Sequence, residues 1–192
     1  MPIVVSLSSP ELAELVAPHT SRLVGLAFRV NDPVISFSRV GEYLRHPIPT
    51  LHTFHISTDT PRLHTVEFIP RAYDYFFKYS KTLVAEGISS IGGYQVSPSA
   101  PAVFPHVTDL TLCTNECVTI HIADLLNTFE HLPALERVCV TFRSGWYNHW
   151  DRHRTITPPH VQEMNVFTSR PGSCIPPILE LIRLPNLTSL RF

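Results

Sequence analysis

One spacing of apolar residues recurs along the 192-residue chain. In this frame a proline stands two residues before an apolar residue, and two more apolar residues follow three and five positions after that one. Six copies have the full form, with apolar positions at Leu51, Phe54 and Ile56; Leu63, Val66 and Phe68; Val107, Leu110 and Leu112; Leu135, Val138 and Val140; Val161, Met164 and Val166; and Leu187, Leu190 and Phe192. A seventh copy begins at Leu23 without the proline, and a weak eighth begins at Ile91.

The frame predicts a β-strand at each copy. Its last two apolar residues are two positions apart, so both side chains point to the same side of a pleated strand. The proline lacks an N–H group and disfavours helix at the residue before it, which ends any preceding helix. The predicted strands are centred on residues 25–28, 53–56, 65–68, 109–112, 137–140, 163–166 and 188–191.

The distances between copies identify the repeat class. Most steps from one first apolar residue to the next match the period of leucine-rich repeats, about 20–29 residues. We therefore predict an α/β leucine-rich repeat solenoid with a parallel concave sheet and outer helices. Two steps, from Leu51 to Leu63 and from Ile91 to Val107, are too short for a full coil. Either one of these strands is misassigned or the coils over residues 51–107 are irregular, so residues 51–103 hold either two or three coils.

Helices are predicted between the strands. The apolar residues from Ile122 to Leu132 recur at helical spacing, and Pro133 ends that helix. The other segments predicted to be helical are residues 9–17, 34–44, 71–86 and 175–182. Residues 88–103 are predicted to be a loop, and residues 143–158 a polar, aromatic insertion.

The same alternation separates a core from a binding surface. The predicted core contains Leu26, Phe54, Leu110, Leu112, Val138, Val140, Val166 and Leu190. Residues that alternate with the core point outward on the concave face, and these are the candidate partner-binding residues Thr53, His55, Glu67, Asp109, Thr111, Arg137, Thr141, Glu163, Asn165 and Phe167. Both charge signs occur among them, which favours a polar protein partner over nucleic acid.

Net charge, apolar runs and cysteine content indicate which partners and which cellular compartment to expect. The net charge is −1, with 15 basic and 16 acidic residues, so no basic surface for nucleic acid is expected. No apolar run approaches the roughly 20 residues of a membrane span. The first residues lack the basic start and cleavage site of a signal peptide, and the four cysteines show no disulfide pattern. We expect a cytoplasmic or nuclear protein.

Candidate chemistry is sparse. His149, Asp151 and His153 alternate, which suggests an alternative function as an enzyme or metal-binding protein that uses the loop 149–153. A zinc site needs three or four convergent ligands, and Arg152 stands among these residues. The pair Cys113 and Cys117 lacks a second pair at a matching spacing. The prediction is therefore a protein that is not an enzyme and has no catalytic residues, metal, cofactor or small-molecule substrate.

Three segments, Phe104–Leu112, Leu132–Val140 and Leu184–Phe192, carry the frame best. They resemble the leucine-rich repeat region of F-box-like proteins of the divergent fungal type. In that family an F-box docks on the adaptor of a ubiquitin ligase and the repeats hold the substrate. The resemblance implies a protein-binding module that is the substrate-recognition part of a ubiquitin ligase receptor, although no F-box pattern stands before residue 20.

Domain organisation is predicted from the position of the frame relative to the ends of the sequence. Residues 1–192 are expected to form a single leucine-rich repeat domain. The last copy of the frame ends on Phe192, and Pro2, Val4 and Leu7 echo the frame weakly. Because terminal coils of a solenoid need polar caps, we expect this domain to be incomplete at both ends.

Overall fold

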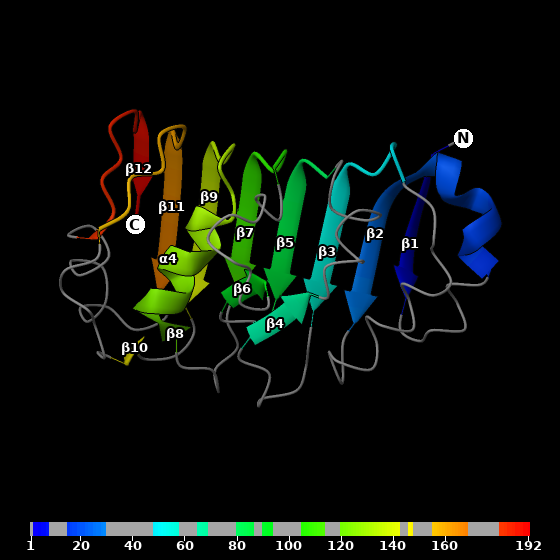
Figure 1. Cartoon of the computed structure of the whole chain (residues 1–192), viewed down its shortest axis with the longest axis horizontal. Helices are drawn as coiled ribbons and strands as arrows, with labels where there is room; N and C mark the ends of the chain where they lie inside the picture. The colour runs from blue at the N-terminus through cyan, green and yellow to red at the C-terminus, as the bar shows by residue number, and fades with distance from the viewer. Residues whose placement is uncertain are drawn as a thin grey trace.

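A computed structural model places eight parallel strands side by side in one open sheet (Figure 1). The structure describes residues 2–7, 15–29, 48–57, 65–68, 80–86, 90–93, 105–113, 120–142, 146–147, 155–168 and 181–192. The sheet contains, in spatial order, β1 (Ile3–Leu7), β2 (Leu23–Arg29), β3 (Thr53–Ser57), β5 (Thr82–Glu86), β7 (Asp109–Cys113), β9 (Arg137–Phe142), β11 (Glu163–Thr168) and β12 (Ser189–Arg191). Spatial order follows chain order, so the chain advances along the sheet by one strand at a time.

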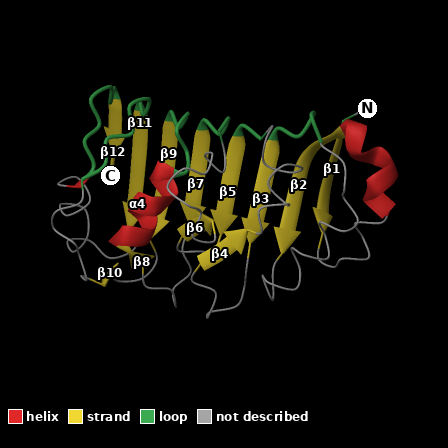
Figure 2. Ribbon diagram, in the orientation of Figure 1, coloured by secondary structure: helices red, strands yellow, loops and turns green. Residues whose placement is uncertain are grey.

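The remaining described elements are short. Two small parallel sheets pair β4 (Thr65–Phe68) with β6 (Ser90–Gly93), and β8 (Ile120–His121) with β10 (Trp146–Tyr147). The helix α4 (Ile122–Glu130) and the 3₁₀ helix η1 (Ala17–Arg22) complete the set (Figure 2). The chain is therefore an α/β protein with an open, all-parallel main sheet and few helices. No helix among the described residues is long and apolar enough to cross a membrane.

The predicted strands are confirmed as strands, and most lie in the main sheet. The strand at residues 65–68 is the exception, because β4 pairs only with β6. The weak copy at Ile91 also lies in a strand, β6, inside the segment predicted to be a loop. The predicted helix that begins at Ile122 is confirmed as α4.

Three other helix predictions fall mainly outside the described residues, and one is wrong. Residues 34–44 and 175–180 lie outside them, whereas in the predicted helix 9–17 the structure shows Leu15 and Val16 as helical. The helix predicted over residues 71–86 is wrong at its end, because Thr82–Glu86 form β5. Residues 71–79 lie outside the described part of the chain.

The coil that contains β5 explains the two short steps. Ser80 takes the first position of the frame, and Leu83 and Ala85 take the next two, all of them fully buried. Ser80 stands one repeat period after Leu51 and one before Val107. When Ser80 replaces Leu63 and Ile91 as a coil start, every step between coils falls within the period of about 20–29 residues. The described residues of the segment 51–106 therefore contribute two strands to the main sheet, β3 after Leu51 and β5 after Ser80.

The prolines of the frame stand at tight turns. The backbone N–H of Leu51 donates to the carbonyl of Ile48, at 3.0 Å, across Pro49 and Thr50. Equivalent bonds join Leu135 to Leu132, at 3.1 Å, and Leu187 to Leu184, at 3.3 Å. Proline is favoured at the second position of such turns because its φ angle is already set. In these three copies the frame therefore encodes the corner before the strand as well as the strand itself.

A repeated hydrogen-bond pattern holds successive coils in register. The carbonyl of His52 accepts from the backbone N–H groups of Lys81 and Thr82, each at 3.0 Å. The carbonyl of Thr108 accepts from Glu136 and Arg137, at 2.8 and 2.9 Å. The same arrangement follows at the carbonyls of Lys81, Glu136 and Gln162. Because each coil is fixed to the next at the same position, the strand side chains line up across the sheet.

One face of the sheet is packed and covered. Leu125, Leu126 and Phe129 of α4 belong to the same buried cluster as the inward residues of the strands (Figure 2). Seven of the eight predicted core residues are buried, and Leu190 is the exception at 38% exposed. The prediction for Leu190 is wrong because β12 is the last strand of the sheet and pairs, among the described strands, with β11 alone.

Candidate functional site

The opposite face of the sheet, here called the open face, carries the side chains that alternate with the core. In β3 and β7 the buried residues alternate with partly exposed ones. In Figures 1 and 2, α4 lies on the packed side of the sheet. The open face therefore presents partly exposed side chains to a partner along β3 and β7.

The register of the strands arranges the open face into three rows. The first row is Gly25, Thr53, Thr82, Asp109, Arg137, Glu163 and Ser189. The second row is Ala27, His55, Val84, Thr111, Cys139, Asn165 and Arg191. The third row is Arg29, Ser57, Glu86, Cys113, Thr141 and Phe167. Residues next to each other in a row sit on neighbouring strands, close enough for their side chains to interact.

Nine of the ten predicted partner-binding residues lie in these rows. The first row contains Thr53, Asp109, Arg137 and Glu163, the second contains His55, Thr111 and Asn165, and the third contains Thr141 and Phe167. The placement predicted for Glu67 is wrong, because β4 lies outside the main sheet. The structure thus brings onto one face predicted residues from four strands that are far apart in the sequence, β3, β7, β9 and β11.

Several open-face residues were missed by the sequence prediction. Thr82, Val84 and Glu86 were missed because β5 was predicted to be helix. Cys113 and Cys139 were missed although the alternation places them on the same side as Thr111 and Thr141. The signal that could have found β5 is the position of Ser80, one repeat period after Leu51.

The centre of the first row is an ion pair between neighbouring strands. Nη2 of Arg137 donates to Oδ2 of Asp109 at 2.7 Å, and Nε of Arg137 donates to Oδ1 of the same carboxylate. Thr108 Oγ1 also donates to Oδ2, at 2.7 Å. Burial acts to raise the pKa of Asp109, but the hydrogen bonds from Arg137 and Thr108 outweigh it, so the pKa lies below its usual value. Two parallel N–H···O bonds fix the orientation of the guanidinium as well as its position.

Arg137 is surrounded by acidic side chains. The hydrogen bond to Asp109 raises the pKa of Arg137, and the charges of Asp109, Glu136 and Glu163 raise it further. Its Nη1 atom lies 4.0 Å from Oε2 of Glu136. Glu163 follows Arg137 in the first row on β11. The row therefore alternates acid, base, acid, and its centre carries an excess of negative charge.

His55 and Glu86 form a second contact between strands. Nε2 of His55 lies 3.3 Å from Oε2 of Glu86, a distance that suits an ion pair when the imidazole is protonated. Nε2 is enclosed, yet it makes no hydrogen bond of good geometry within the described residues. His55 and His52 do not form part of a metal site there, because no group of three or more His, Cys, Asp or Glu side chains converges among the described residues.

The end of the open face near β7, β9 and β11 differs from the end near β1, β2 and β3. Toward β2 the first two rows contain the small, uncharged residues Gly25, Ala27 and Thr53, and the third row begins with Arg29. Toward β11 lie the charged first row, the thiols of two cysteines and Phe167, whose side chain is 47% exposed. A charged edge, neutral polar middle and exposed aromatic ring therefore occur together on three adjacent strands.

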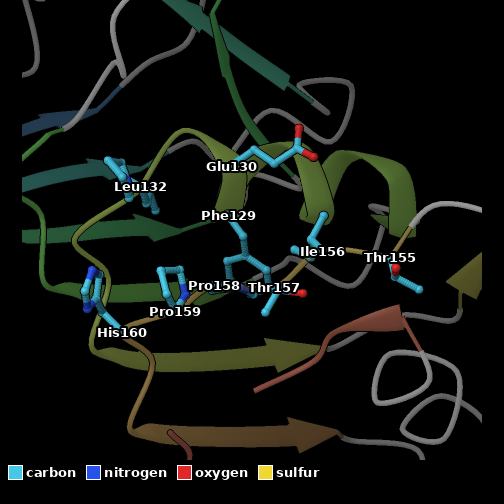
Figure 3. A pocket seen from close by; sticks show the side chains of 10 residues that line it. Phe129, Glu130, Leu132, Thr155, Ile156, Thr157, Pro158, Pro159 and His160 are labelled. Carbon is cyan, nitrogen blue, oxygen red and sulfur yellow. The ribbon is translucent and has the colours of Figure 1, made fainter. Parts of the chain in front are cut away.

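A pocket lies on the other side of the molecule, between the end of α4 and residues 155–160 (Figure 3). Its volume is about 490 Å³, and its floor is formed by the buried Phe129, Leu132 and Ile156. Its rim contains one carboxylate, Glu130, and one imidazole, His160, which point away from each other in Figure 3. Glu130 and His160 are therefore not arranged as an acid–base pair in this pocket.

The alternative metal site predicted at residues 149–153 lies outside the described residues, as does Cys117. The resemblance to F-box-like proteins likewise rests on the sequence alone. No family model, curated protein or solved structure matches this chain.

Proposed function

We propose that this protein is a leucine-rich repeat solenoid that binds a protein partner on the open face of its parallel sheet. Three features support the repeat assignment: a regular coil length within the period of this repeat class, one parallel strand per coil, and a turn with proline before most strands. Solenoids of this kind present extended surfaces that other proteins bind.

The observation that carries the binding proposal is the composition of the open face on β7, β9 and β11. Interfaces combine a polar rim with aromatic and arginine side chains near their centre. Arg137 is held rigid by Asp109, and Phe167 exposes an aromatic ring on the neighbouring strand. Residues of these two types carry much of the binding energy in protein interfaces. A rigid guanidinium also loses little conformational freedom when a partner binds.

The charges of the first row indicate what the partner presents. Asp109 is already paired with Arg137, whereas Glu163 makes no ion pair with the described residues. A basic side chain of a partner would face Glu163 and Glu136, whose charges both act on Arg137. Nucleic acid is disfavoured, since its phosphates would meet more carboxylates than guanidinium groups in this row. The proposed partner is therefore a protein segment with a basic residue at the contact.

The resemblance to F-box-like proteins gives a finer form of the same proposal. In that form the open face holds the substrate of a ubiquitin ligase, and an F-box docks on the ligase adaptor. The coding sequence that flanks these 192 residues tests this role directly. An F-box upstream, together with adaptor binding by the longer protein, would support this role. Flanking sequence without an F-box would count against the ligase role and leave only the proposal of a binding module.

Photocrosslinking tests the binding face itself. A photoreactive amino acid placed at Asn165 or Thr111, in the second row, should form an adduct with the partner in cells. The same amino acid at Glu130, which is exposed on α4, serves as the matched control on the packed side.

The expected result is a shared adduct at positions 165 and 111 that is absent at position 130. Mass spectrometry of the adduct identifies the partner, and the crosslinked peptide shows whether a basic residue lies at the contact. An adduct that forms at position 130 but at neither open-face position would contradict the proposed face. Equal adducts at all three positions would indicate non-specific contact and would also count against it.

A further inference from the structure

Two cysteine thiols of the open face lie on neighbouring strands. Cys113 is on β7 and Cys139 is on β9, and both are partly exposed. The register pairs Thr111 with Cys139, and Cys113 with Thr141. The two cysteines are therefore diagonal neighbours in a block of two thiols and two hydroxyls. Burial raises the pKa of Cys139, and the charge of Cys113 raises it further.

The spacing of this pair favours a bridging ion over a disulfide. Parallel strands lie about 4.8 Å apart and two residues rise about 6.6 Å, so diagonal Cα atoms are separated by about 8 Å. A disulfide joins Cα atoms that are closer than about 7 Å, so a direct S–S bond would require the backbone to move. Metal–thiolate bonds of about 2.3 Å, the length found at zinc sites, would separate two sulfur atoms on opposite sides of an ion by about 4.6 Å. Side chains that lean toward each other across the diagonal can span that distance.

The donor set selects the kind of ion. Thiolates are soft ligands that favour Cu(I), whereas structural zinc requires four ligands. Within the described residues no third His, Cys, Asp or Glu side chain joins the two thiols in a cluster. From these observations we propose that Cys113 and Cys139 form a two-coordinate site for a soft monovalent cation of the Cu(I) class. On binding, the ion forms two metal–sulfur bonds and displaces both thiol protons to solvent, which leaves a dithiolate complex of net charge −1.

Charged residues lie on two sides of the site: Arg137 on β9, which is paired with Asp109, and Glu86 on β5, which the register pairs with Cys113. Arg137 stands two residues before Cys139 on the same strand and the same face, so it is the nearest guanidinium along β9. The hydroxyl-bearing Thr111 and Thr141 complete the block without adding a competing ligand of soft character. This site does not depend on the proposed binding of a protein partner, because its ligands come from this chain alone.

Titration with Cu(I) under anaerobic conditions, in competition with a chromophoric Cu(I) chelator, tests the site. The starting protein is the 192-residue chain with Cys117→Ser and Cys174→Ser, which leaves only the two thiols of interest. We expect one Cu(I) per chain, with two sulfur neighbours in the X-ray absorption spectrum. Cys113→Ser and Cys139→Ser should each weaken binding by more than about 100-fold, because each removes half of the ligands.

Two further variants separate loss of the ligand from loss of the fold. Cys113→Ala and Cys139→Ala provide second substitutions at the same sites, and circular dichroism reports whether each variant is folded. Thr141→Val is the matched control, since it changes a neighbour of Cys113 but no sulfur, and it should keep the one-to-one stoichiometry. The proposal is overturned if the folded starting protein binds no Cu(I), if binding survives removal of both thiols, or if mild oxidation joins Cys113 and Cys139 in a disulfide in place of Cu(I) binding.

Discussion

Arg137 and Asp109, which are 28 residues apart in the sequence, form a bidentate ion pair across neighbouring strands of the open face. Such contacts exist because successive coils repeat in register, so that each residue of one strand meets its counterpart in the next. The pair lies at the start of the strands, where the carbonyl of Thr108 also accepts two backbone N–H groups from the next coil. Side-chain and backbone contacts therefore tie the same two coils together at one place.

The first prediction concerns acid stability. Because the pKa of Asp109 is lowered in the folded state, its contribution to stability is present above the unfolded pKa of about 3.9 and is lost as the pH falls through the lower folded value. The midpoint of urea unfolding should therefore be lower for Asp109→Asn than for wild type at neutral pH. The difference between the two proteins should shrink as the pH falls below about 4.

Arg137→Gln is the matched control for this acid effect, because it removes the partner and keeps the carboxylate. Its unfolding midpoint should vary with pH in the same way as that of Asp109→Asn. If wild type and Asp109→Asn differ by the same amount at neutral pH and below about pH 3, the ion pair does not contribute to stability as described.

The second prediction separates the packed face from the open face within one strand. Leu110 is buried on β7, and its neighbour Thr111 is on the open face. Leu110→Ala should lower the free energy of unfolding by about 2–5 kcal/mol through lost burial and a cavity. Thr111→Ala should change it by about 0.5 kcal/mol or less. Chemical denaturation measures both, and equal effects would show that the two faces are not distinguished as the structure has them.

The third prediction tests the strand that sequence patterns predicted to be helix. Ala85 is fully buried in β5, whereas the adjacent Val84 is only partly buried on the open face. Ala85→Asp should destabilise the fold by about 3 kcal/mol or more, since it buries a carboxylate without a partner. Val84→Asp should cost about 1 kcal/mol, the range of strand propensities. A larger effect at Val84 than at Ala85 would show that the side chains of β5 face the opposite sides of the sheet from those described here.

A fourth prediction concerns the last strand of the sheet. Leu190 occupies the same frame position as the buried Val138 and Met164, but it is 38% exposed. Leu190→Ala should therefore cost less than about 1.5 kcal/mol, clearly below the range expected for Leu110→Ala. A loss equal to that of Leu110→Ala would mean that Leu190 is covered in the protein in solution.

The sequence was sufficient to predict the coils whose frame is carried by large apolar residues. Val107, Leu110 and Leu112 form such a frame, and the structure confirms β7 there. The alternation then placed nine open-face residues correctly, since period-two geometry follows from the strand itself. Proline was predicted to end helices, and the structure gives it a further role as the corner residue of the turn before the strand.

The errors have equally local causes. In β5 the frame is carried by Ser80 and Ala85, which are small or polar. The helical spacing of the aromatic residues from Tyr73 to Phe77 led the predicted helix to be extended over β5. The frame at Leu63 predicts a strand correctly, but local spacing contains no information on which sheet the strand joins, so Glu67 was misplaced. The diagonal placement of Cys113 and Cys139 on neighbouring strands depends on the register between those strands, which local spacing in the sequence does not specify.

The central claim is that the open face, and not the packed side, binds the partner. Once crosslinking has identified that partner, titration calorimetry can compare Glu163→Lys, in the first row, with Glu130→Lys on α4, which makes the same charge change on the other side of the molecule. We predict that Glu163→Lys weakens binding at least tenfold, about 1.4 kcal/mol, and that Glu130→Lys leaves the affinity within about twofold. Unchanged affinity in Glu163→Lys with a tenfold loss in Glu130→Lys would contradict the claim.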